Sequence, residues 1–160
     1  MNSLLLTLAT CAGAAALEGL LAGRGVQQRF SQLRMPRLAP PLKMWIIIGS
    51  AYYLICCVVL YRLLVLPPTS LRTAALSLIL IVLLANAFWN YLFFRLGSLR
   101  LSFIVGVLYS LIALGLLILL YQLDRIATGS FLPYAFYLLY ANWWGHALWR
   151  TNPIVMREGN

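Results

Sequence analysis

Five apolar runs of about 20 residues constrain the fold of this chain more than any other feature. They cover approximately the ranges 3–22, 43–64, 73–94, 101–122 and 131–150, and charged residues lie at their ends or occur once within them. A helix needs roughly 20 residues to cross a hydrocarbon core about 30 Å thick. The sequence therefore predicts an all-α integral membrane protein, built as a bundle of five transmembrane helices.

The composition agrees with this class, because 63% of the residues are hydrophobic and 9% are charged, against about 25% charged in soluble domains. The five spans use nearly the whole chain, so residues 1–160 are predicted to form a single membrane domain that ends in a short cytosolic tail, 151–160. The first run has no basic segment before it and contains Glu18. It is therefore interpreted as a spanning helix rather than a cleaved signal peptide.

The basic residues lie mostly on one side of the predicted bundle. Nine of the 12 fall on the side of the first loop, the third turn and the C-terminus: Arg24, Arg29, Arg34, Arg37, Lys43, Arg95, Arg100, Arg150 and Arg157. The other side holds Arg62, Arg72 and Arg125. This asymmetry predicts an external N-terminus and a cytosolic C-terminus. The formal charge of +9 is thereby explained by membrane topology and does not indicate a nucleic-acid partner.

The three cysteines, Cys11, Cys56 and Cys57, all fall within predicted spans. Their number is odd and their spacing matches no common ligand set. They are interpreted as small packing residues, and no metal site is predicted.

The first loop, about residues 22–42, is roughly twice as long as the other connections. Loops of this length are commonly lids or binding loops, and prolines reduce the entropy cost of ordering them. We expect a basic cover over one end of the bundle, with a solvated connector as the alternative. The candidate lid residues are Arg29, Arg34, Pro36, Arg37, Pro40 and Pro41.

Three unusual side chains share one depth in the predicted membrane. Each lies six residues before an arginine that marks the end of its helix on the basic side: Glu18 before Arg24, Trp89 before Arg95 and Trp144 before Arg150. At 1.5 Å per residue all three should lie about 9 Å below that surface. This places them together beneath the long loop.

Helical spacing groups further residues with these tryptophans. Asn86, Trp89, Asn90 and Phe93 form one stripe, and buried amides are costly in lipid unless they face the bundle interior or a ligand. Trp45 and Trp149 are assigned instead to the interfacial aromatic belt. The candidate ligand-binding residues are Asn86, Trp89, Asn90, Phe93, Tyr137, Tyr140, Ala141, Trp144 and His146.

Three segments carry a resemblance to a known family. RFSQLRMPRLAPP (29–41), NAFWNYLFF (86–94) and LPYAFYLLYANWWGHALWRTN (132–152) resemble motifs of the translocator protein family, also called tryptophan-rich sensory proteins or peripheral-type benzodiazepine receptors. The similarity covers roughly residues 23–153. It implies a five-helix bundle, commonly a homodimer, with a pocket closed by the first loop. Members bind tetrapyrroles such as protoporphyrin, sterols in some lineages, and synthetic aromatic ligands.

The resemblance transfers to particular positions and fails at others. Asn86 and Trp89 match the asparagine and tryptophan of the third helix, and Ala141 and Trp144 occupy pocket positions of the last helix. The proline and tryptophan of the second-helix motif are missing, since that motif reads here as Ile47, Gly49, Tyr52 and Tyr53. Gly145 and His146 interrupt the sterol-recognition pattern, so sterol binding is not expected.

The residues and the resemblance together predict a receptor, sensor or transporter-like protein for tetrapyrroles or similar flat hydrophobic ligands. Such a ligand would stack on Trp89 and Trp144 while loop arginines met its carboxylates. Porphyrin or haem is a possible ligand, with no obligatory cofactor. His146 is either an axial haem ligand or a structural residue.

Two other functions remain open on the sequence. The first is an enzyme that degrades porphyrin oxidatively through pocket tryptophans, although no carboxylate pair or nucleophile–base motif is present and no catalytic residue is assigned. The second is a small multidrug-type cation exporter that uses Glu18.

Overall fold

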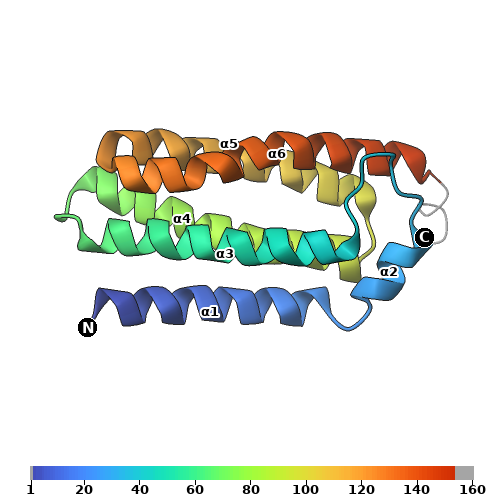
Figure 1. Cartoon of the computed structure of the whole chain (residues 1–160), viewed down its shortest axis with the longest axis horizontal. Helices are drawn as coiled ribbons and strands as arrows, with labels where there is room; N and C mark the ends of the chain where they lie inside the picture. Colours follow the sequence, from blue (N-terminus) through green and yellow to red (C-terminus); the bar gives the residue numbers. More distant parts are fainter. Residues whose placement is uncertain (1, 154–160) are drawn as a thin grey trace.

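The computed structural model describes residues 2–153 and contains, within that range, six α-helices and one π-helical turn (Figure 1). In chain order these are α1 (Ser3–Ala22), α2 (Val26–Gln32), α3 (Leu42–Val65), α4 (Ser70–Asn90), the π-turn η1 (Tyr91–Arg95), α5 (Leu99–Leu123) and α6 (Arg125–Thr151). The tail predicted beyond residue 153, with Arg157, lies outside the described residues.

Polar caps and glycines set the helix ends. The side chains of Asn2, Thr69, Ser98 and Asp124 accept a hydrogen bond from a backbone N–H in the first turns of α1, α4, α5 and α6, which satisfies donors that a helix start leaves free. Gly23 ends α1 with a positive φ of 74°, a conformation that glycine adopts without steric cost.

The long helices form a ring in the order α1, α4, α5, α6, α3, and α3 also contacts α4. Within residues 2–153, four segments are long and apolar enough to cross a membrane: Ser3–Ala22, Leu42–Val65, Ser70–Arg95 and Leu99–Leu123. α6 has 27 residues but carries most of the polar and aromatic side chains discussed below. Large apolar side chains such as Leu20, Leu54 and Leu139 are exposed on the outside, as expected for surfaces that face lipid.

The first loop is not a structureless connection, because it contains the seven-residue helix α2. After α2 the chain runs back over the end of the bundle where α6 ends (Figure 1). Pro41 is the N-cap of α3, where its missing N–H costs nothing. The sequence pattern alone did not reveal α2, since its seven residues are too few for a clear helical period.

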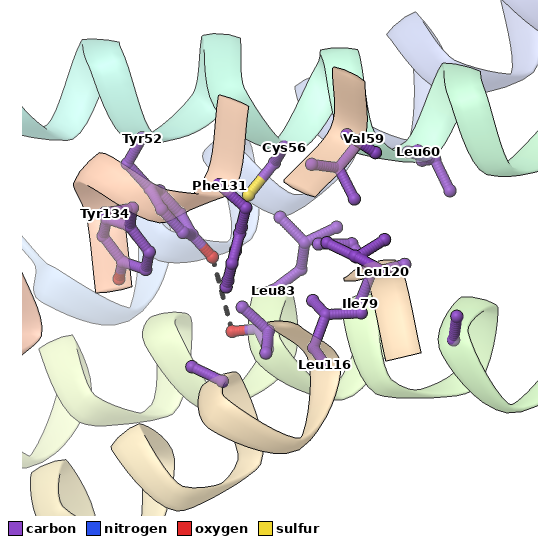
Figure 2. Packing of buried hydrophobic residues seen from close by; sticks show 14 of the residues in the cluster. Tyr52, Cys56, Val59, Leu60, Ile79, Leu83, Leu116, Leu120, Phe131 and Tyr134 are labelled. Atoms are coloured by element: carbon purple, nitrogen blue, oxygen red, sulfur yellow. Dashed lines mark hydrogen bonds between the residues drawn. The ribbon is translucent and has the colours of Figure 1, made fainter. Parts of the chain in front are cut away.

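A packed core fills the half of the bundle away from the loop. Cys56, Val59, Leu83, Leu116 and Phe131 are buried there, together with neighbours from α3, α4, α5 and α6 (Figure 2). The three cysteines are free thiols, and Cys11 and Cys56 belong to this core. A second buried cluster lies at the loop end: Leu33, Phe93, Leu99, Trp144 and Leu148.

An ion pair joins α3 to the α5–α6 turn at the core end. Arg62 donates to Asp124 Oδ2 from Nη2 at 2.5 Å and from Nε at 3.1 Å. Asp124 also caps α6 through Ala127 N at 2.7 Å. The Arg62 guanidinium, helped by the Ala127 N–H, lowers the pKa of Asp124 below its ordinary value.

We expect this pair to make stability depend on pH in the acidic range. A carboxylate with a lowered folded-state pKa stabilises the fold above its unfolded pKa, about 4, and loses that contribution as pH falls through the folded pKa. Thermal unfolding in detergent at a series of pH values should therefore show a Tm that drops on acidification, with a smaller drop in Asp124→Asn. This variant keeps a side chain suited to the helix cap; an equal drop in both proteins would contradict the assignment.

Candidate functional site

A cavity of about 470 Å³ lies inside the bundle between the two buried clusters. Side chains from α1, α2, α3, α4, η1, α5 and α6 line it. Its volume falls within the range of roughly 300–1,000 Å³ typical of small-molecule sites.

Aromatic rings form the wall of the cavity nearest the loop. The ring centroids of Trp45 and Trp144 lie 4.7 Å apart, and those of Phe93 and Trp144 lie 5.7 Å apart. Trp89 stacks on Phe93 with a centroid distance of 5.0 Å and an interplanar angle of 12°. These contacts fix large apolar surfaces that can stack against a planar ligand.

The π-helical turn η1 follows directly after Trp89 and Asn90. The π-helical hydrogen bonding, between residues five apart, is seen where the Leu96 N–H donates to the Tyr91 carbonyl oxygen at 3.0 Å. Such turns insert one residue into a helix and occur often at functional sites. The Trp89 indole is held by its own hydrogen bond, from Nε1 to the Ser102 carbonyl oxygen at 2.9 Å. In contrast, the buried Nε1 atoms of Trp45 and Trp144 have no partner within the described residues.

A polar group lies on the α1 side of the cavity. Glu18 Oε2 accepts hydrogen bonds from the Tyr53 hydroxyl and from Asn86 Nδ2, each at 2.6 Å. All three residues line the cavity. They come from α1, α3 and α4, so the group forms only when these helices pack together.

Tyrosines and a second amide face the cavity from the core side and from α5. The hydroxyls of Tyr109 and Tyr134 share a hydrogen bond of 2.6 Å, and Asn142 Nδ2 donates to Ser110 Oγ at 2.7 Å. These four residues line the cavity. Their polar atoms are paired with each other, which leaves mainly aromatic surface for a ligand.

The first loop is fixed to the bundle by hydrogen bonds at three places. Arg29 Nη2 donates to the Gly97 carbonyl oxygen at 2.5 Å, and Tyr140 donates its hydroxyl to the Leu38 carbonyl oxygen at 2.8 Å. The Asn152 amide pairs with the backbone of Arg34 in both directions, at 2.9 and 3.0 Å. We call the Arg34–Asn152 pair the loop clasp.

Phe30 from α2 closes the cavity beneath the loop. Its ring lies 6.4 Å from Trp45, 6.2 Å from Phe93 and 5.9 Å from Phe94, measured between centroids. Burial lowers the pKa of the neighbouring Arg29, but a guanidinium stays protonated in proteins. Arg29 therefore acts here as a cation bonded to the α4–α5 turn, at Gly97.

Gly97 is suited to this contact for two reasons. Its φ is +67°, which favours glycine. A Cβ atom at this position would also lie 2.9 Å from Arg29 Nη2. The turn between η1 and α5 thus allows the close approach of the loop arginine.

Residues 6–150 match the family model described as the TspO/MBR family. The chain belongs to the TspO/MBR family. The resemblance seen in the sequence motifs is thereby confirmed, and the match spans every helix described above except the first residues of α1 and the end of α6. A search of curated proteins found no match.

The structure of this TspO/MBR protein brings most of the predicted binding residues to the cavity. The lining includes Asn86, Trp89, Asn90, Phe93, Tyr137, Ala141 and Trp144. Tyr140 and His146 are not among the lining residues: Tyr140 bonds the loop, and His146 is exposed and packs against Phe103 and Trp149. The described residues contain no group of three or more His, Cys, Asp or Glu that could hold a metal ion.

The predicted lid residues lie above the cavity rather than in its wall. Arg34, Arg37 and Pro41 are exposed, and Arg29, Pro36 and Pro40 are half-buried. The loop residues that line the cavity are instead Val26 and Phe30. This arrangement gives the loop an apolar inner face and a basic outer face.

Several lining residues of this TspO/MBR chain were not predicted from the sequence. Trp45, assigned to the interfacial belt, lines the cavity against Trp144. Tyr52, Tyr53, Tyr109 and Tyr134 also line it. In the sequence, Tyr52 and Tyr53 already stood out, because they lie in the second-helix motif that departs from the family pattern. This departure was the signal that could have identified them as lining residues.

Proposed function

We propose that this protein is a membrane receptor or transporter-like protein that binds flat, largely apolar ligands, tetrapyrroles such as protoporphyrin included, inside the bundle. The observation that carries the proposal is the cavity of about 470 Å³ with Trp45, Trp89 and Trp144 in its lining. Pockets of this kind bind through apolar and aromatic surface with a few placed polar groups.

Binding would place the planar ligand body against the indoles. Phe30 would cover it from the loop side, because this ring already lies against Phe93 and Phe94. Carboxylates of a tetrapyrrole would point toward the loop end of the bundle, where Arg34 and Arg37 are exposed. In this proposal a porphyrin or haem is a ligand, and no obligatory cofactor is expected.

In the membrane, α6 would be the fifth crossing beside the four apolar segments. α6 runs alongside α3 and α5 over the length of the bundle (Figure 1), and its polar residues Asn142 and Tyr134 face inward to the cavity. The loop with its arginines lies at the end where α6 finishes (Figure 1). The distribution of basic residues supports a cytosolic position for this end and an external position for the N-terminus.

The test is a titration of the purified protein with protoporphyrin IX, followed by tryptophan fluorescence. We expect saturable binding in the wild type and a Kd raised roughly five- to tenfold in Trp89→Phe or Trp144→Phe, since each change removes stacking surface worth about 1 kcal/mol. Trp143→Phe is the matched control, because Trp143 is 46% exposed and does not line the cavity.

Binding that is absent, or equally weakened by Trp143→Phe, would contradict the proposal. Loss of the porphyrin absorption spectrum with time would instead favour the oxidative enzyme. The same samples therefore distinguish a receptor from a catalyst.

A further inference from the structure

Glu18 places a carboxylate in the wall of an otherwise aromatic cavity. Its Oε2 atom accepts two hydrogen bonds of 2.6 Å, from Tyr53 and Asn86. Within residues 2–153, its other oxygen, Oε1, accepts no hydrogen bond and is not among the buried polar atoms that lack a partner. Two short hydrogen bonds to one oxygen fix the orientation of the carboxyl group and leave its other oxygen for a further partner.

No basic side chain neutralises this carboxylate in the described part of the chain. The one ion pair found there joins Arg62 to Asp124. Arg29 bonds to Gly97, and Arg72 bonds to the carbonyl oxygens of Leu63 and Leu64. A charge withdrawn from water is costly unless it is paired. A cationic ligand would supply the counter-charge for Glu18 that the described residues do not.

The surrounding rings favour the same kind of ligand. Trp45, Tyr53 and Trp89 line the cavity with Glu18, and the faces of aromatic rings attract cations. The hydroxyl and amide beside Glu18 hold its carboxylate in place. Glu18 and these aromatic rings thus line the same cavity.

We propose that the ligand of this cavity is a planar aromatic molecule with a positively charged nitrogen, and that Glu18 is the counter-ion for that nitrogen. This inference rests on the proposed function, because it assigns the ligand class of the same cavity. It also predicts that an anionic group on a ligand stays away from Glu18 and points toward the loop arginines.

The experiment compares two probes of nearly equal shape, 9-aminoacridine, which is protonated at neutral pH, and acridine, which is neutral there. Binding of both is measured by fluorescence to the full-length protein in a non-ionic detergent, with protein-free micelles subtracted. We expect the wild type to bind the cation about tenfold more tightly than the neutral probe. Glu18→Gln should abolish this preference, because it removes the charge and keeps the shape.

Tyr53→Phe is the matched control, since it removes a hydrogen bond to Glu18 and keeps the charge. Preference for the cation that is lost in Glu18→Gln and kept in Tyr53→Phe supports the inference. Equal affinities for the two probes in the wild type, or equal loss of preference in both variants, would overturn it while leaving aromatic binding intact. If neither acridine nor protoporphyrin IX binds the wild type, the proposed function itself fails.

Discussion

Replacing Phe131 with alanine is expected to lower the free energy of unfolding by about 2 kcal/mol. Phe131 is 0% exposed in the core of the bundle (Figure 2). In a membrane the Phe131 side chain lies in an apolar medium even before the helices pack, so the free energy of transfer from water contributes little. The cost that remains is that of the cavity left by the missing ring. Unfolding by heat or denaturant in mixed detergent micelles measures the change.

Phe136→Ala is the control on the same helix, because Phe136 is 64% exposed. Its truncation should change the free energy of unfolding by less than about 0.5 kcal/mol. Phe131 does not line the cavity, so ligand binding should survive in folded Phe131→Ala. If the two alanine variants lost equal stability, the assignment of Phe131 to the buried face of α6 and of Phe136 to its exposed face would be wrong.

Replacing Asn152 with alanine is expected to open the loop and speed ligand dissociation by roughly 5- to 140-fold. Asn152 is 5% exposed, and its loss leaves the N–H and C=O of Arg34 without partners. Each hydrogen bond contributes about 0.5–1.5 kcal/mol net, so the loss of the two bonds to Arg34 costs about 1–3 kcal/mol, which is expected to favour the open loop. Stopped-flow displacement of a bound porphyrin measures the dissociation rate.

Thr151→Ala is the neighbouring control, since the exposed Thr151 hydroxyl bonds to Ala147 within its own helix. It should leave the dissociation rate unchanged. Limited proteolysis at the exposed Arg37 gives a second measurement, in which Asn152→Ala should be cleaved faster. Equal protection of the two variants would show that the loop clasp does not hold the loop closed.

Counting residues from the helix ends predicted that Glu18, Trp89 and Trp144 would lie near one another. All three line the cavity, although Arg24 lies beyond the end of α1 and the π-turn η1 separates Trp89 from Arg95. The rise of a helix is nearly constant. The approximate position of these residues along the bundle could therefore be predicted without knowledge of how the helices pack.

The direction in which each side chain points could not be predicted in the same way. Trp45 and His146 both occur near helix ends with aromatic neighbours, yet Trp45 faces the cavity and His146 faces outward. That difference depends on the rotation of each helix about its axis and on the ring order, in which α1 packs between α3 and α4. The partners of Glu18 come from these two helices, so sequence spacing within α1 contained no information about them.

The position of α1 between α3 and α4 sets an order for assembly during synthesis. A ribosome delivers α1 to the bilayer first, but its place in the ring exists only after α3 and α4 have been inserted. Until then the Glu18 carboxylate lacks both Tyr53 and Asn86, and an unpaired carboxylate in lipid is unfavourable. Although α1 is made before α3 and α4, it therefore docks after them, and its docking completes the wall of the cavity.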